Sequence, residues 1–477
     1  MQSKHPLITG TIILTFSSLI TKLIGFFFRI FLCKRIGAEK LGIYQLIIPF
    51  FALGHTICCS AIETAISKHV AESKKTSKKI YLLCGTTLSL CLSVIVAAVL
   101  FIFSSRIGIY VLKDSRTIFP LKIIAFLLPL SSIHACIYAY HIGNEKPQVP
   151  AIGLVLEQIT RFLCLFLLCA NGVYIAFYCD FAGELASTLF AVFSLIFVLK
   201  EIKPGIKDLK QHSLNLYKTA YPLALTRILT CTLTGLESIL IPTLLVLYGL
   251  NKSDAMSMYG ILTGIAIPVI LFPCCIITSL STMLLPSISK SNINNNNEKI
   301  TKQINLIFSF CMYMGMYSSF IFINYSNFIE DTLFDYDLVS SFIEILGWLC
   351  PFLYIGITFS AIINGLGKTK TIFVHNIIVS VLKITCIIIT IPIFGIKGYL
   401  ITLLIAQILM CFLHIRTVKT NFKLNTNIVK NLLKPLAYIV LAYLCALILP
   451  EKNQVLSIII SSGVFMSLSY FDFNTFI

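Results

Sequence analysis

Positively charged side chains stand inside several apolar stretches of this sequence. An ionisable residue at the centre of a bilayer costs about 2.5–3.5 kcal/mol on the scale derived from membrane insertion, so it usually faces a partner or a watered cavity. Guanidinium and ammonium groups in such a cavity replace the water around a multiply charged anion. The candidate substrate-binding residues, for which we predict anion binding, are Lys22, Arg29, Arg161, Arg227 and Lys383.

Spacing distinguishes these basic positions from one another. Lys22 and Arg29 are seven residues, or two helical turns, apart, so one helix presents both on the same face. Instead of binding an anion, Arg29 could extend toward the outer membrane interface, because its apolar stretch ends soon afterwards. Lys383 has the alternative of extending its stem to the interface or pairing with a neighbouring helix. A binding role is favoured most for Lys22 and Arg227.

Two acidic residues are candidate charge partners for these cations. Glu157 precedes Arg161 by one helical turn, so Arg161 either binds an anion or is simply neutralised by Glu157. Glu63 places a carboxylate in the second apolar stretch. Pairing with Lys22 or Arg29 would neutralise it.

Other polar side chains in the apolar stretches are candidates for binding a coupling ion, Na⁺ or H⁺. Glu237 lies in the proposed second half of the molecule, beside the expected cavity. Asn376 and Ser380 are one turn apart and offer oxygen ligands for a hard cation. Asp180 and Glu184 are also one turn apart; we favour two interfacial carboxylates over a cation or proton site for them.

The sequence carries no motif of an enzyme. It has no Walker loop, no His-Glu-x-x-His zinc motif and no Ser/His/Asp arrangement, and its His residues show no ligand spacing. We therefore expect no catalytic residue, no cofactor and no resident metal.

The composition predicts an integral membrane protein. Hydrophobic residues make up 57% and charged residues 12% of the 477 positions, whereas soluble domains average about 45–50% and about 25%. The net charge of +17 comes from short basic clusters between apolar runs, which indicates membrane loops and not nucleic-acid binding. The 17 cysteines form no Cys-x-x-Cys pair and mostly lie in apolar runs, so we read them as small hydrophobes.

About fourteen apolar stretches reach the ~20 residues that a membrane-spanning helix needs. Basic residues are about twice as frequent in the loops on the N-terminal side as in the opposite loops, which predicts cytoplasmic termini in the cell membrane. Prolines interrupt the second, eighth and tenth stretches. The predicted spans lie near 7–32, 42–66, 80–103, 118–140, 150–170, 173–199, 219–243, 256–284, 303–325, 338–364, 371–393, 398–415, 432–450 and 454–471.

An internal repeat is visible in the rare charged positions. Gly143-Asn-Glu-Lys146 aligns with Gly365-Leu-Gly-Lys368, and the same offset places Arg161 on Lys383. A second alignment places Lys22 on Arg227. The predicted fold is an all-α integral membrane protein with two pseudo-symmetric lobes of six helices each, plus a C-terminal helix pair. The boundaries are 1–199 for the N-terminal lobe, 200–218 for a basic cytoplasmic connector, 219–418 for the C-terminal lobe and 419–477 for the helix pair. A polar segment, 286–302, is expected to be a flexible linker.

Several segments resemble the stage V sporulation protein B group of polysaccharide flippases, within the multidrug/oligosaccharidyl-lipid/polysaccharide exporter superfamily. The block from Tyr259 to Pro286 is the most specific, and the resemblance covers nearly the whole chain. The segments that carry it are 7–14, 24–31, 36–45, 64–72, 143–161, 236–242, 258–264, 279–286 and 363–368.

The resemblance implies a V-shaped pair of lobes around a cavity and alternating access. The implied activity is movement of a lipid-linked, pyrophosphate-bearing sugar precursor of peptidoglycan, spore cortex or polysaccharide to the outer leaflet. In the related lipid II flippases, basic residues of the first helix and second lobe contact the head group; the matching positions here are Lys22, Arg29 and Arg227. A family cation site matches Glu237 and Asn376.

Two departures from the family pattern leave other functions open. Ile30 stands where lipid II flippases commonly have an acid, and Glu63 is unexpected in the sporulation group. The alternatives are a multidrug or cation antiporter of the same superfamily and a non-transporting scaffold for cell-wall or spore assembly. The expected partners are the anionic lipid-linked sugar and membrane lipids, with no nucleic acid and with the protein as a monomer.

Overall fold

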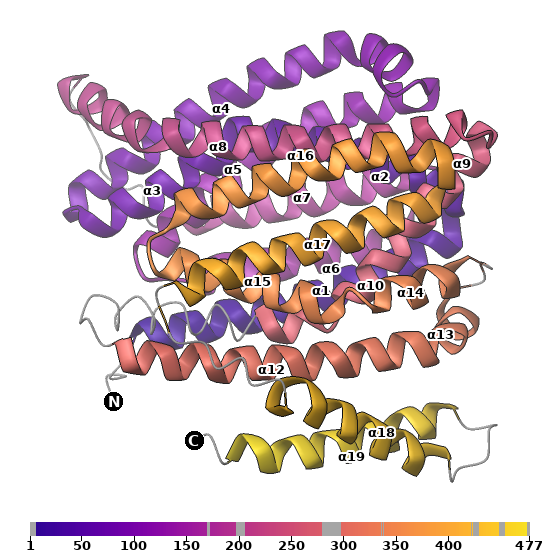
Figure 1. The fold of residues 1–477 in the computed structure, drawn as a ribbon. Helices are drawn as coiled ribbons and strands as arrows, with labels where there is room; N and C mark the ends of the chain where they lie inside the picture. The colour runs from indigo at the N-terminus through magenta and orange to yellow at the C-terminus, as the bar shows by residue number, and fades with distance from the viewer. Residues whose placement is uncertain are drawn as a thin grey trace. The chain divides into compact units, whose positions relative to one another are not determined.

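The computed structural model describes residues 6–168, 172–196, 206–278, 297–334, 336, 338–420, 422, 429–447 and 454–474. Within these ranges the chain forms helices joined by turns and contains no strand, which confirms the predicted all-α class (Figure 1). Most of the predicted linker 286–302, the motif 279–286 and residues 200–205 of the predicted connector lie outside the described residues.

Many of the helices are long and apolar enough to cross a membrane. Eleven helical segments of the described chain meet this test, and a bent pair, α14 (Val339–Gly347) with α15 (Cys350–Gly365), makes up to twelve. Two shorter apolar helices, α18 (Lys434–Leu447) and α19 (Gln454–Asn474), follow. The protein is therefore a multi-pass membrane protein, and the count of about fourteen spans stays a prediction.

The chain divides into two compact units, Met1–Gly260 and Ile261–Ile477. The first contains α1 to α8 and most of α9, with a π-helical segment, η1, between α2 and α3. The second contains the end of α9 and the helices from α10 onward. The predicted lobes, with boundaries at 199 and 219, stay a prediction. The helices of the first unit are α1 (Pro6–Ile36), α2 (Ala38–His55), η1 (Thr56–Ser60), α3 (Ala61–Glu72), α4 (Lys75–Arg106), η2 (Ile107–Val111), η3 (Ser115–Thr117), α5 (Ile118–Gly143), α6 (Gln148–Leu167), α7 (Tyr174–Leu195), α8 (Ile206–Leu247) and α9 (Lys252–Ile261).

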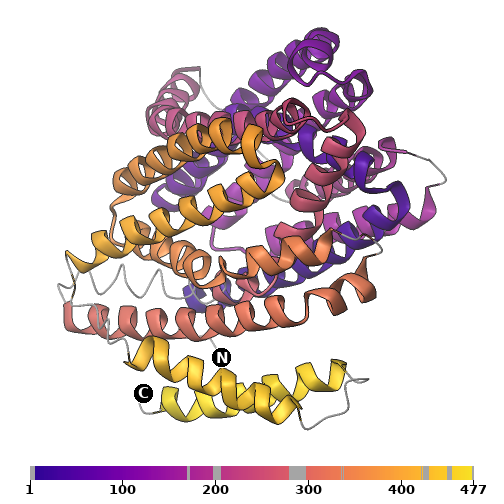
Figure 2. The ribbon, with the colours of Figure 1, turned by 45° about the vertical axis from the view of Figure 1, so that its right-hand side comes forward.

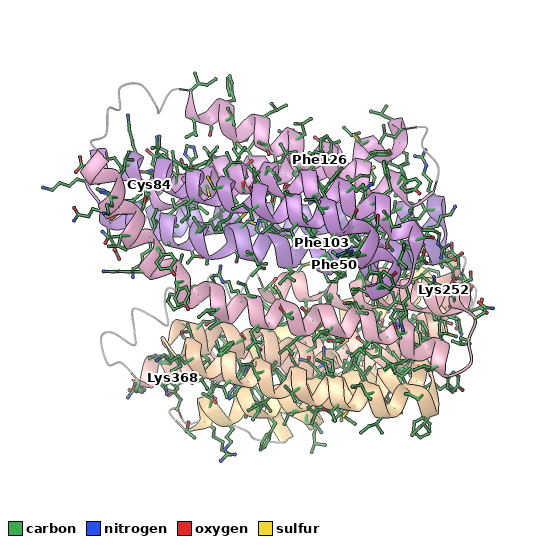
Figure 3. All side chains as sticks on the ribbon, turned by 90° about the horizontal axis from the view of Figure 1, so that it is seen from above. Phe50, Cys84, Phe103, Phe126, Lys252 and Lys368 are labelled. Atoms are coloured by element: carbon green, nitrogen blue, oxygen red, sulfur yellow. The ribbon has the colours of Figure 1, made fainter. Side chains whose placement is uncertain are left out.

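Helix α5 forms the core of the first unit. It packs against α3, α4 and α7, while α6 lies between α1 and α7. The span that contains α5 is 72% buried within the protein, whereas that of α4 is 17% buried. Apolar side chains at the surface, such as Phe103 (40% exposed) and Phe126 (60% exposed), suit contact with lipid (Figure 3).

Close helix contacts in this unit depend on glycine. A Cβ atom on Gly42 of α2 would lie 2.1 Å from the carbonyl oxygen of Met256 on α9, and one on Gly260 would lie 2.3 Å from that of Ala38. A side chain at either position would push the two backbones apart. At one end of the same unit, Lys252 lies 3.6 Å from Asp114, and Arg116 bridges Asp114 and Glu39 at 2.9 and 2.7 Å (Figure 3).

The second unit is built from long neighbouring helices. Helices α16 and α17 run side by side, as do α18 and α19 (Figures 1 and 2). The aromatic rings of Tyr317 and Phe465 stack at 4.4 Å between centroids and hold α19 to α12. The predicted interruption of the tenth apolar stretch is confirmed, because α14 and α15 meet within it at a bend of 62° and Pro351 occupies the first turn of α15. The remaining helices of the second unit are η4 (Leu262–Ala266), α10 (Ile267–Leu271), α12 (Asn297–Asn324), α13 (Ser326–Leu333), α16 (Thr369–Phe394), α17 (Ile396–Lys419) and η5 (Val429–Leu433).

Candidate functional site

A polar cavity of about 210 Å³ lies inside the first unit. Helices α1, α2, α5, α6 and α7 contribute to its wall, so residues far apart in the sequence meet there. Two of the five predicted basic residues line it. The lining residues are Arg29, Tyr44, Gln45, Ile48, Phe51, Ile124, Leu127, Arg161, Asp180 and Glu184.

Arg161 is held by two buried carboxylates. Its Nη2 atom donates to Oε1 of Glu157 at 2.8 Å, and its Nε atom lies 3.3 Å from Oδ1 of Asp180. The Arg161 side chain is 19% exposed and both carboxylates are 9% exposed. Glu157 is the partner that the one-turn spacing predicts, and Asp180 of α7 is a second partner that the sequence did not indicate.

The packing of α6 against α7 sets this geometry. A Cβ atom on Gly183 would lie 3.0 Å from the carbonyl oxygen of Glu157 and 3.4 Å from Cβ of Arg161. The missing side chain lets α7 approach α6 closely enough for Asp180 to reach Arg161. On the other side, the Tyr44 hydroxyl of α2 donates to Oδ2 of Asp180 at 3.0 Å. Asp180 is thus fixed from two helices.

Arg29 differs from Arg161 in its surroundings. Arg29 lines the cavity and retains exposed surface, and among the described residues it forms no hydrogen bond or ion pair. Its charge interacts at longer range with Tyr44, Arg161 and Asp180. This position favours the cavity over the outer interface as the place of Arg29. A guanidinium with free donors can bind an anion, whereas that of Arg161 is already engaged.

Glu184 and His134 form a second polar pair at this cavity. Oε2 of Glu184 lies 3.5 Å from Nδ1 of His134 on α5 and has no hydrogen-bond partner in the described part of the chain. Counted as whole residues, Asp180 and Glu184 are each 6% exposed. The favoured interpretation of these two acids as interfacial carboxylates is therefore wrong, because α7 turns both toward the protein interior. His134 and Tyr44 could not be predicted from the sequence, since no local spacing connects them to α7.

Arg227 of α8 contacts the π-helical segment η1 in a different part of the first unit. Its Nη1 atom donates to Oγ of Ser60 at 2.6 Å and also to the carbonyl oxygen of Ser60. Ser60 ends the π-helical segment η1, and such segments leave backbone groups in altered pairing. One turn along α8, the sulfur of Cys231 lies 3.2 Å from the hydroxyl of Thr56. Arg227 thus fastens α8 to η1 and does not line the cavity with Arg29.

Glu63 lies one turn beyond η1 and interacts electrostatically with Arg227. The expected partners were Lys22 and Arg29; Arg227 is a cation near Glu63 that the sequence did not indicate. The reason is that α8 packs against η1 and α3, the helix that carries Glu63, whereas α1 packs mainly against α6.

The remaining candidates lie elsewhere in the chain. Lys22 is exposed on α1, two turns from Arg29, and Glu237 is buried on α8 in the first unit. Asn376, Ser380 and Lys383 lie on α16 of the second unit. Their roles in binding substrate or a coupling ion stay predictions. Within the described ranges, no three His, Cys, Asp or Glu residues are placed to hold a metal ion.

Comparison with known proteins connects this site to a family. Residues 7–292 match the model of the polysaccharide biosynthesis protein family, which is more than half of the chain. The chain belongs to this family. Stage V sporulation protein B of Bacillus subtilis (strain 168) is 26% identical over 435 residues, covering 87% of this chain and 84% of the relative. Sporulation protein YkvU of the same organism is 22% identical, covering 78% and 85%. The resemblance to the stage V sporulation protein B group is thus confirmed.

Solved structures of the same fold are those of transporters and a flippase, not enzymes. The lipid II flippase MurJ in an inward closed conformation has a TM-score of 0.76 at 19% identity, covering 97% of this chain and 99% of that one. A multidrug resistance MATE family transporter in an inward-facing conformation has a TM-score of 0.67 at 13% identity, covering 87% and 94%. The family member described here therefore has the fold of these membrane transporters.

Proposed function

We propose that this protein is a flippase that moves a lipid-linked, pyrophosphate-bearing sugar precursor from the inner to the outer leaflet of the cell membrane. The precursor serves peptidoglycan, spore cortex or another polysaccharide, and the protein works as a monomer by alternating access with both termini in the cytoplasm. Support comes from the match to the polysaccharide biosynthesis family, the sporulation relatives and the fold shared with a lipid II flippase.

The main support for the proposal is the position of Arg29 and its lack of an ion-pair partner among the described residues. The guanidinium of Arg29 lies in the wall of a polar cavity within a membrane-spanning unit. A pyrophosphate leaving water loses its hydration, and Arg29 can replace part of it with a bidentate, charge-assisted pair of hydrogen bonds. The polyprenyl tail stays in the lipid and needs no polar path.

The other predicted cations have supporting parts in this proposal. Arg161, held between Glu157 and Asp180, sets the charge of the cavity wall and positions Asp180. Lys22, on the same helix as Arg29, is proposed to attract the anion toward the cavity. Roles for Arg227 and Lys383 in contacting the head group belong to the proposal too, and Arg227 would act there in addition to its contact with Ser60.

The test is lipid movement in liposomes that contain the purified protein. A fluorescent undecaprenyl-pyrophosphate disaccharide-peptide is placed in both leaflets, and its protein-dependent exchange is followed by chemical quenching from outside. The matched control is Arg106→Ala, since Arg106 lies 5.5 Å from the ring of Phe103 at the end of α4, outside the cavity lining. We expect Arg29→Ala to lose exchange while Arg106→Ala keeps it. Full exchange by Arg29→Ala would refute the assignment of Arg29.

An antiporter of drugs or cations is the second candidate. It is favoured by the buried carboxylates Glu157, Asp180 and Glu184 and by the fold shared with a multidrug resistance transporter. Such a protein should move a lipophilic cation in the same liposomes, and Asp180→Asn should stop it while Arg29→Ala does not. Exchange of the pyrophosphate lipid without cation movement would exclude this alternative. A scaffold would move neither compound.

A further inference from the structure

Carboxylates outnumber cations around the cavity of the first unit. Glu157, Asp180 and Glu184 carry three negative charges when ionised, against two positive charges on Arg29 and Arg161. Arg161 already contacts the first two acids. Glu184 is thus the carboxylate that no described cation neutralises by direct contact.

The surroundings of Glu184 do not suit a permanent carboxylate ion. Its side chain is 8% exposed, Oε2 accepts no hydrogen bond from the described residues, and Nδ1 of His134 lies 3.5 Å from it. Nδ1 of His134 also lies 3.4 Å from Oγ1 of Thr188. Burying an ionised carboxylate without hydrogen bonds costs several kcal/mol. A proton on Oε2 removes that cost, and the carboxylic acid can then donate to the imidazole.

Several charged and titratable groups face Glu184 from each helix packed around it. With Glu184 protonated, the two remaining carboxylates balance the two guanidinium groups; with Glu184 ionised, the cluster carries one excess negative charge. The groups that interact with Glu184 or line the same cavity are Arg29 on α1, Tyr44 on α2, His134 and Tyr138 on α5, Glu157 and Arg161 on α6, and Asp180 on α7, and His55 of α2 interacts with His134.

A proton fits this position better than a metal ion. The described residues contain no group of three His, Cys, Asp or Glu side chains placed to hold a metal. The cavity volume of about 210 Å³ leaves room for water, of which each molecule takes about 30 Å³ in the liquid. Because Glu184 lines this cavity, hydronium in it can protonate the Glu184 carboxylate, forming an O–H bond there and leaving water.

We propose that Glu184, beside His134, is a proton-binding site whose protonation is coupled to anion binding at Arg29. A pyrophosphate on Arg29 would neutralise one of the two cations and make the cluster more negative, which raises its affinity for a proton. By linkage the proton raises the affinity for the anion by the same factor. Anion and proton then occupy the cavity together, as in a symporter. This inference rests on the proposed function for the anion, but not for the proton site.

The coupling is tested by proton uptake on lipid binding. Purified protein in nanodiscs is mixed with undecaprenyl pyrophosphate in weak buffer with a pH-sensitive dye, and bound lipid is measured in parallel. We expect wild type to take up close to one proton for each lipid bound, and its affinity to fall about tenfold per pH unit where free Glu184 is ionised. Glu184→Gln should bind without proton uptake and without this pH dependence. The matched control Glu344→Gln changes an exposed acid on α14 and should behave as wild type.

The proton site is tested separately, without any lipid. Infrared spectra of the protein in nanodiscs should contain a carbonyl stretch of a protonated carboxylic acid that disappears as the pH is raised. This band should be absent from Glu184→Gln, present in Glu344→Gln and shifted in its titration by His134→Asn. A band unchanged by Glu184→Gln overturns the proton site. Lipid binding without proton uptake in wild type overturns the coupling and leaves the flippase proposal standing. Absence of lipid binding in wild type contradicts the flippase proposal, while the infrared result still decides the proton site.

Discussion

The two arginines of the cavity should respond very differently to the same substitution. Arg161→Gln removes the cation between two carboxylates that are each 9% exposed, whereas Arg29→Gln removes a cation without an ion pair among the described residues. Removing one partner of a buried ion pair costs about 3–5 kcal/mol, because the other charges stay buried without compensation. Loss of an exposed, unpaired charge costs less than about 1 kcal/mol.

These energies convert into a measurable shift of the unfolding midpoint. With an unfolding entropy of roughly 2.1 cal/mol/K per residue, a chain of 477 residues loses about 1 °C for each kcal/mol. We therefore expect Arg161→Gln to unfold about 3–5 °C below wild type, and Arg29→Gln within about 1 °C of it. A thiol-reactive dye suits the measurement, because buried free cysteines such as Cys136 and Cys311 react only on unfolding.

A second substitution separates charge from packing. Asp180→Asn added to Arg161→Gln removes one of the two uncompensated carboxylates, so the double variant should regain part of the lost stability. The reasoning would be refuted if the two single arginine variants unfolded at the same temperature. A double variant less stable than Arg161→Gln alone would also contradict it.

Three further outcomes follow from contacts away from the cavity. Gly42→Ala places a Cβ atom 2.1 Å from the carbonyl oxygen of Met256, so we expect a loss of about 1–3 kcal/mol in the same dye assay, and an unchanged midpoint would contradict the close contact of α2 and α9. Burial alone would raise the pKa of Asp114, but hydrogen bonds from Arg116 lower that pKa below its usual value. Its ionised form is therefore stabilising above the unfolded pKa of about 3.9, and the advantage of wild type over Asp114→Asn should be lost as the pH falls below about 4; a constant difference would argue against it. Arg227→Ala removes the hydrogen bonds to η1, and amide hydrogen exchange in η1 and the start of α3 should accelerate, with exchange in α7 as the internal reference.

Local spacing explains which parts of the site were predictable. Residues one turn apart on a helix are neighbours whatever surrounds that helix, so the sequence predicted the pair of Glu157 and Arg161. The contact of Arg161 with Asp180 joins two helices and depends on how closely they approach, which Gly183 permits. A glycine in an apolar stretch does not by itself indicate which partner it admits. The buried position of Glu184 beside His134 was missed for the same reason.

The internal repeat in the sequence did not indicate the contacts of Arg227 and Glu63, which depend on helix packing. The alignment of Lys22 with Arg227 did not indicate that Arg227 donates a hydrogen bond to Ser60 at the end of η1. A π-helical segment depends on one altered turn and leaves no periodic signal in the sequence. The interaction of Glu63 with Arg227 was not predicted for the same reason, since it depends on the packing of α8 against α3.

The sequence by itself determined that this protein lies in a lipid membrane, that its structure is all-α and to which family it belongs. With 57% hydrophobic and 12% charged residues, long apolar runs had to become helices that satisfy their own backbone hydrogen bonds in lipid. Which charges inside those helices are neutralised was decided only by the tertiary structure. Each helix can rotate about its axis at little cost in lipid, and the rotation is fixed by contacts such as those of Gly183 and Tyr44. Those contacts place Arg161 beside Glu157 and Asp180 and place Arg29 in the cavity wall without an ion pair among the described residues. Whether a charge inside the membrane is neutralised depends on which residues lie next to it in space.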